Sequence, residues 1–194
     1  MTSEPYILIT ADTHAGGSHA HYREYLDPQY RDEFDEWRGG CKNPAQEHYG
    51  SKKLRNWDYK VRTKDQTSQG VVGELVFPNT VPPFFRKSIV TAQPPRPEHY
   101  EHALAGIRAH NRWLKDFCDE DSVQRAGIGL ILPNDLDEAI KDIELIARAG
   151  LCQHSRRRKN HLCGLLSDGS LARADYDRHE KRAIQRRSLA QIPP

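Results

Sequence analysis

Three short apolar segments divide the chain, and each ends in residues that stop a strand. The first covers residues 6–14 and ends at a Gly-Gly pair. The second and third cover residues 71–77 and 126–132, and a Pro-Asn pair closes both. These runs are rich in β-branched residues and too short for helices, which is typical of strands buried on both faces. The pattern therefore predicts three strands of a parallel sheet.

Helical spacing of apolar residues follows the second and third strands. It predicts one amphipathic helix over residues 98–118 and another from Asp135 to about residue 147. Asn134 or Asp135 is expected to cap the second of these helices, and Gly150 is expected to end it. Residues 19–64 are polar and aromatic with little periodicity, which predicts an irregular insertion with short helices near residues 22–25 and 28–37.

The second and third strands carry the same ending. Val76–Asn79 and Ile131–Asn134 both read apolar-apolar-Pro-Asn, 55 residues apart, and each precedes a helix. Apolar strands that alternate with amphipathic helices predict an α/β fold with a parallel sheet and right-handed crossovers. A closed eight-stranded barrel and an open doubly wound sheet both satisfy this pattern.

Composition narrows the class of protein. The chain has 194 residues, a formal charge of +2 and four cysteines. It has no run of about 18 apolar residues and no secretory leader pattern, so a cytoplasmic protein with reduced thiols is expected, without a membrane partner. The near-neutral charge gives no general argument for nucleic acid as a partner.

The charge is unevenly distributed, and this suggests a boundary at Gly150. Residues 151–194 carry a charge of +6, which leaves −4 for residues 1–150, and Tyr176 is the only aromatic residue of the basic part. We expect one domain over residues 1–150 and a poorly ordered basic tail over residues 151–194. A shifted reading frame or an unspliced segment would also produce such an abrupt change.

The basic tail offers two further hypotheses. Its arginine runs could bind phosphates of nucleic acid, although no aromatic residues are interleaved for base stacking. Cys152, His154, His161 and Cys163 are zinc-ligand types, but one intervening residue is a narrow spacing for each ligand pair.

Asp12 and His14 are the best candidates for chemistry. They close the first strand, and reactive groups in parallel α/β folds gather at the carboxyl ends of strands. Residues at i and i+2 of a strand share a face, so the carboxylate and the imidazole would make half of a Zn²⁺ or Mn²⁺ site. The alternative is an aspartate that caps the following turn beside an exposed histidine.

Other polar residues are weaker candidates. Glu74 lies in the middle of the second strand, where a charge needs a partner or a metal, and Arg55 lies in the insertion near the expected site. Trp57 and Asp58 could join Arg55 in contacting an aromatic acid, or the three could form a surface ion pair beside a packed indole. The histidines of the long helix region, His99, His102 and His110, are expected to be solvated.

Several stretches together resemble the amidohydrolase-related family, the branch that includes the aminocarboxymuconate-semialdehyde and resorcylate decarboxylases. The resemblance covers roughly residues 5–150. It is carried by the segments 11–14, 55–58, 69–79, 109–117 and 125–133, and most specifically by the second strand with its Pro-Asn ending and by the Asn-x-Trp-Leu sequence at residues 111–114.

The resemblance implies a (β/α)₈ TIM barrel whose metal is held by an acidic-x-His pair on the first strand and by later His and Asp ligands. Asp12 and His14 match the first pair, whereas no residue after Gly150 matches the later ligands. It therefore implies the first three βα units of an incomplete barrel. The expected function is a metal-dependent hydrolase or decarboxylase that uses zinc or manganese and acts on a small acid or amide, with aromatic acids among the candidate substrates.

A barrel of this kind needs on the order of 250 residues, so we expect a truncated form with weak metal binding and little activity. An exposed edge on the third strand would need a cover, which a homo-oligomer could provide. The competing hypothesis is a non-enzymatic protein that binds nucleic acid or a protein partner through the basic tail.

Overall fold

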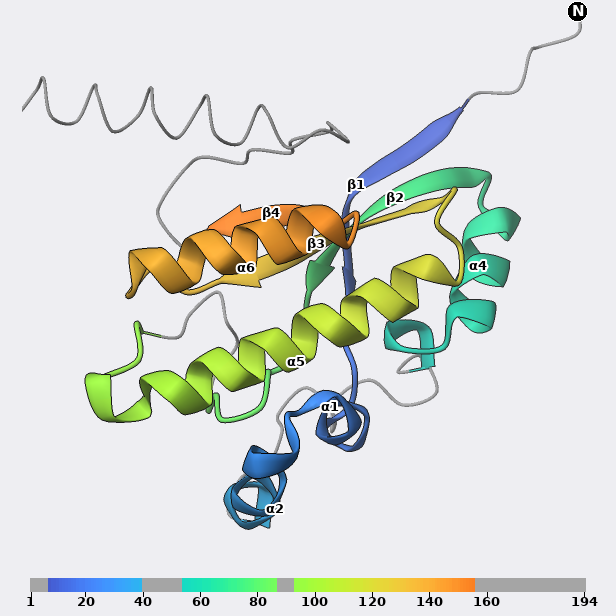
Figure 1. Cartoon of the computed structure of the whole chain (residues 1–194). Coiled ribbons are helices and arrows are strands. Elements are labelled where there is room, and N and C mark those ends of the chain that lie inside the picture. Colours follow the sequence, from blue (N-terminus) through green and yellow to red (C-terminus); the bar gives the residue numbers. More distant parts are fainter. Residues whose placement is uncertain (1–6, 40–53, 87–92, 156–194) are drawn as a thin grey trace, which may run out of the picture.

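The structure is a computed structural model, and it describes residues 7–39, 54–86 and 93–155 (Figure 1). No helix in these ranges has the length and hydrophobicity needed to cross a bilayer. The strands are β1 (Leu8–Ala15), β2 (Val71–Pro78), β3 (Arg125–Ile131) and β4 (Cys152–Ser155). The α-helices are α1 (His19–Tyr25), α2 (Arg31–Gly39), α4 (Tyr59–Ser68), α5 (Tyr100–Asp119) and α6 (Leu136–Arg148). Short 3₁₀ helices cover Pro28–Tyr30 and Pro97–His99.

The four strands form one sheet in the order β1-β2-β3-β4, and all pairs are parallel. One core cluster joins residues from β1, β2 and β3 to side chains of both α5 and α6, so these helices cover the same face of the sheet. Crossovers of the same hand place successive helices on the same face of a parallel sheet, as found for α5 and α6. The predicted parallel α/β fold is confirmed, and the strand order has no reversal of the doubly wound kind among the described strands.

Two glycines of β3 let the helices approach the sheet closely. A Cβ atom at Gly127 would lie 2.8 Å from the Leu114 side chain of α5, and one at Gly129 would lie 2.9 Å from Ile146 of α6. Side chains at these positions would push the helices outward. The glycines therefore explain why a strand of this composition can be buried beneath two helices.

The expected helix signals are found at α6. The Asp135 side chain accepts hydrogen bonds from the backbone N–H groups of Asp137 and Glu138, and Gly150 adopts a φ of 71° after the helix. Helix α4 was not expected, because its inward contact is made by the charged residue Arg62 and no apolar stripe marks it.

The sheet continues past the expected boundary at Gly150, which corrects the prediction of three strands. Residues Cys152–Ser155 form β4, which pairs with Ile128–Ile131 of β3. This strand contains one apolar residue, so an apolar run could not reveal it, and it is held by backbone pairing to its neighbour. The rest of the basic tail, residues 156–194, lies outside the described part of the chain, with His161 and Cys163.

Where β2 stops pairing with β3, a side chain of α5 forms hydrogen bonds with the β3 backbone instead. The two strands pair only from Glu74 to Val76 on β2 and from Arg125 to Gly127 on β3. Beyond that point, the Asn111 amide of α5 accepts a hydrogen bond from the Leu130 N–H and donates one to the Leu130 carbonyl oxygen, both at 2.8 Å. The amide thus satisfies the backbone of β3 where β2 no longer reaches it.

Candidate functional site

Asp12 and His14 lie on the face of the sheet that the helices leave uncovered. Their neighbours point the other way, because Thr13 donates a hydrogen bond to buried Glu74 at 2.8 Å and Ala15 packs in the core beneath α5. The Nδ1 atom of His14 lies 3.8 Å from an oxygen of Asp12, and both side chains are exposed. The predicted shared face of the two residues is therefore confirmed.

This pair supplies two donors for a metal ion. Within the residues that the structure describes, no group of three or more His, Cys, Asp or Glu side chains could hold a metal. A zinc site uses three or four protein ligands, so Asp12 and His14 alone do not fit a complete site. A resident metal would need further ligands from outside the described residues.

A cleft with a volume of about 730 Å³ opens beside His14, between the end of β1 and helix α4. Arg55 lines it, so two of the four predicted site residues meet here, whereas Asp12 and Glu74 do not line it. The lining residues are polar throughout: His14, Arg55, Asn56, Arg62, Asp65, Gln66, Gln69 and Asn79.

The cleft presents a guanidinium group and several amides. A nitrogen of Arg55 lies 3.3 Å from a carboxylate oxygen of Asp65, with both side chains partly exposed. The Asn79 amide donates to the Asn56 side-chain oxygen at 2.8 Å, and the Asn79 oxygen has no hydrogen-bond partner among the described residues. These groups can bind a small polar ligand that carries a negative charge or an amide.

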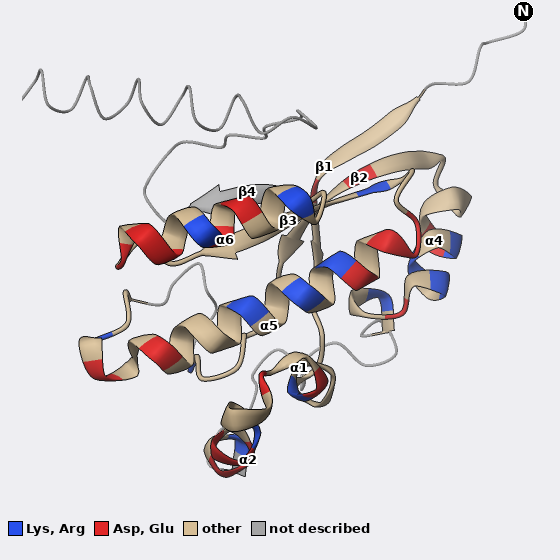
Figure 2. Cartoon of the chain, in the orientation of Figure 1, with Lys and Arg blue, Asp and Glu red and all other residues tan. Residues whose placement is uncertain are grey.

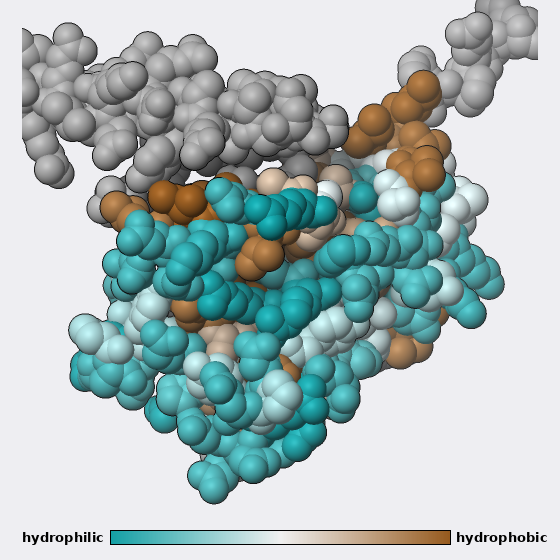
Figure 3. All heavy atoms as spheres, in the orientation of Figure 1, coloured by the Kyte–Doolittle hydropathy of each residue, from teal (hydrophilic) through white to brown (hydrophobic). Residues whose placement is uncertain are grey.

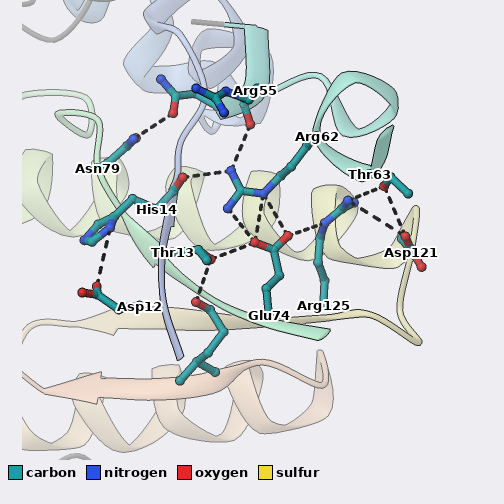
Figure 4. A network of polar contacts seen from close by, with 12 residues as sticks. Asp12, Thr13, His14, Arg55, Arg62, Thr63, Glu74, Asn79, Asp121 and Arg125 are labelled. Carbon is teal, nitrogen blue, oxygen red and sulfur yellow. Dashed lines mark hydrogen bonds and ion pairs between the residues drawn. The ribbon is translucent and has the colours of Figure 1, made fainter. Parts of the chain in front are cut away.

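Glu74 lies in a buried ion network instead of at the cleft (Figure 4). Its carboxylate accepts hydrogen bonds from Arg62 at 2.6 Å and from Arg125 at 2.8 Å, and from the Thr13 hydroxyl. Glu74 shares its face of β2 with Val76, which packs under α5, so its side chain points away from the face of Asp12 and His14.

The environment keeps Glu74 ionised. Burial by itself would raise the pKa of its carboxyl, but the hydrogen bonds from Arg62, Thr13 and Arg125, together with the charge of Arg62, hold the pKa below its ordinary value. A carboxylate with a lowered pKa and three hydrogen-bonding partners is poorly suited to act as a base. The expected partner for this mid-strand charge is thus found, and it is a pair of arginines.

Arg62 is the residue that sequence reasoning missed. Besides binding Glu74, its guanidinium donates to the backbone carbonyl oxygens of His14 and Arg55, each at 3.0 Å. It therefore fixes both of the predicted cleft residues through their backbones. The only signal in the sequence was indirect, since Glu74 required a cation that could have come from any nearby segment.

The remaining candidates have structural roles. Asp58 caps α4 by accepting hydrogen bonds from the N–H groups of Lys60 and Val61, and Trp57 packs against the core. The prediction that His110 is solvated is wrong: it is fully buried, and its Nδ1 atom lies 2.8 Å from the Tyr22 hydroxyl. It projects from the inner side of α5, a helix whose buried face is wider than the apolar spacing indicated.

No protein-family model matches this sequence, and no curated protein matches it. One solved structure with a similar backbone is 2,6-dihydroxybenzoate decarboxylase in complex with 2,6-dihydroxybenzoate, with a TM-score of 0.46 and 15% sequence identity. The matched region covers 75% of this chain and 37% of that one, so this chain spans little more than a third of its length. A likeness of this size assigns no activity.

Proposed function

We propose that this chain is a hydrolase or decarboxylase of the amidohydrolase type, acting on a small acid or amide, with aromatic acids among the candidate substrates, with the help of a divalent metal, zinc or manganese. The observation that carries the proposal is the placement of Asp12 and His14. They lie together at the carboxyl end of β1, on the open face of the sheet, and His14 also lines a polar cleft. Both side chains are exposed, so a ligand can reach them.

Arg55 would bind the substrate in this proposal. Its guanidinium is partly exposed in the cleft, and Asp65 is its ion-pair partner there. A substrate carboxylate could replace Asp65 on the guanidinium, since two parallel N–H groups match a carboxylate well.

No catalytic step is assigned to the metal, because two described donors do not make a complete site. The proposal includes weak metal binding and little activity, as expected for an incomplete barrel. Asp12 and His14 would contribute a carboxylate oxygen and an imidazole nitrogen, and the other ligands would come from residues outside the described ranges.

Calorimetric titration of the full chain with Zn²⁺ and with Mn²⁺ tests the proposal. We expect weak binding at a single site that both Asp12→Ala and His14→Ala abolish, while His99→Ala, at an exposed histidine, leaves it unchanged. Binding that survives both substitutions would remove Asp12 and His14 from the site. Tight one-to-one binding that His14→Ala abolishes would support the location of the metal site but contradict the prediction of weak binding.

An activity assay provides the second half of the test. Hydroxybenzoic acids and their amides would be incubated with the metal-loaded chain, and carbon dioxide or ammonia release would be followed. We expect low turnover that a chelator and His14→Ala both abolish, and a higher KM in Arg55→Met. Turnover that is indifferent to the chelator would contradict the proposal.

The competing function, binding of nucleic acid or a protein through the basic tail, depends on residues 156–194. These lie outside the described part of the structure, and no observation on the described residues favours that function.

A further inference from the structure

Helix α6 carries an apolar stripe that the sheet does not cover. Its buried row is Ala139, Asp142 and Ile146, which face the sheet and α5. A second row, at residues 136, 140, 143 and 147, begins beside the buried row and continues to the surface. Leu136 is 58% exposed and Ile140 is 41% exposed. Figure 3 shows hydrophobic atoms along the margin of α6 that lies away from α5.

The spacing of this stripe is that of a helix-pairing seam. Residues 136, 140, 143 and 147 follow one another at intervals of four, three and four, the spacing at which two helices pack side by side. Ile143 is half-buried against the core, so the seam is anchored at its middle and exposed at both ends. If α6 packed only against its own sheet, its apolar face would end at Ile143.

A row of alternating charges runs beside the stripe. Asp137, Lys141, Glu144 and Arg148 repeat the same intervals one residue later, so they flank the stripe on its solvent side, and the charges alternate along α6 (Figure 2). Within the helix these residues make only exposed ion pairs, such as Arg148 with Glu144 at 3.6 Å. Exposed pairs of this kind contribute little stability, so they can change partners.

The geometry points to a second copy of this chain as the occupant, and we propose that two α6 helices pack antiparallel along this stripe. A twofold axis across the helices keeps both charged rows on the same side. Asp137 then lies opposite Arg148 of the second copy, and Lys141 opposite Glu144 of the second copy, so every facing pair is of opposite charge. A parallel pair would instead bring the charged row against Ala139 and Ile146, which already pack on the sheet.

The contact is small, so the dimer is weak. A helix of 13 residues is about 20 Å long, and one helix pair buries less surface than a permanent dimer needs. The association is therefore a reversible equilibrium with a dissociation constant on the order of micromolar.

Sedimentation equilibrium of the full chain, from about 1 to about 200 μM, tests the proposal. We expect the dimer fraction to rise with concentration and Ile140→Glu to weaken association at least tenfold. The matched control is Leu145→Glu, because Leu145 is 55% exposed on the same helix but lies outside the stripe, and it should leave the equilibrium unchanged.

A charge exchange tests the orientation. Asp137→Arg and Arg148→Glu should each weaken the dimer several-fold, because each places like charges opposite each other. The double variant should restore the dimer, because residue 137 of one copy and residue 148 of the other again carry opposite charges. A chain that stays monomeric throughout, which would mean another occupant or none, would overturn the proposal. Equal dissociation by Leu145→Glu, or a double variant no tighter than either single variant, would overturn it as well.

Discussion

The guanidinium of Arg62 donates a hydrogen bond to the backbone carbonyl oxygen of His14 at 3.0 Å while it binds the carboxylate of Glu74. One buried cation thus joins the exposed candidate site to the core. His14 lies on β1, the outer strand among those that the structure describes, and on that side no described strand is present to bind its carbonyl group. Arg62 also lines the cleft, so the position of the site depends on a cation whose charge is bound in the core.

Loss of Arg62 should destabilise the protein strongly. Arg62→Met leaves Glu74 with Arg125 as its remaining cation, and breaking a buried ion pair on one side costs about 3 kcal/mol or more. Urea denaturation would measure the change in free energy of unfolding. Arg55→Met, which removes a partly exposed ion pair, is the control and should cost less than about 1 kcal/mol. Equal losses in the two variants would contradict the assigned role of the network.

Glu74 should make the stability of the protein dependent on pH. Its pKa is lowered in the folded state, so its stabilising effect is present above the unfolded-state value of about 4.3 and is lost as the pH falls through the folded-state value. Glu74→Gln should therefore be much less stable than the wild type at neutral pH, with a difference that shrinks below about pH 4. Urea midpoints over this range would measure it, with Glu120→Gln as an exposed control. A difference independent of pH would contradict the prediction.

Asn111 should matter more than its polar character suggests. Asn111→Ala leaves the N–H and carbonyl groups of buried Leu130 without partners, which should cost about 2 kcal/mol or more. The same substitution at exposed Asn134 should be nearly neutral. Hydrogen exchange would provide a local measurement, since the Leu130 amide should exchange faster in Asn111→Ala. Unchanged protection at Leu130 would show that the amide does not close the sheet there.

His110 should remain neutral well into the acidic range. Burial lowers its pKa to about 3 in the folded protein, whereas an unfolded chain binds the proton near pH 6.5. Its contribution to stability is thus complete above about pH 6.5 and is lost progressively as the pH falls from there. Nitrogen-detected NMR of the imidazole should show a neutral ring at about pH 4. A protonation step between about pH 5 and about pH 7 would contradict this prediction.

The pattern of apolar residues was sufficient to predict the strands and helices whose position depends on burial of apolar side chains. The strands β2 and β3 and the helices α5 and α6 pack through aliphatic and aromatic side chains, which leave a clear period in the sequence. The prediction that β1 is buried on both faces is wrong: Leu8 is 48% and Ile9 is 67% exposed, and Ala15 alone of this strand lies in the core. Helix α4 and strand β4 leave no such period. The first is held by Arg62 and the second by backbone pairing to β3, so neither has a hydrophobic signal.

The candidate site was predictable in part for the same reason. Alternation along a strand is enough to place Asp12 and His14 on one face, and the structure bears this out. The segment around Glu74 does not show which face of β2 its side chain occupies. That face is determined by Arg62 of α4 and Arg125 of β3, which lie in other segments of the chain. The roles of Arg62 and His110 depend on contacts between segments distant in the sequence, which a single sequence does not reveal.

The Asn111 amide also limits where the chain can change in length. Asn111 and Leu130 are 19 residues apart in the sequence, and the two hydrogen bonds between them fix one position of α5 against one position of β3. A residue inserted within α5 or β3 between these points would shift one partner relative to the other, and a short amide side chain cannot follow it. Insertions and deletions in this part of the protein should therefore be tolerated only in the turn at residues 120–124.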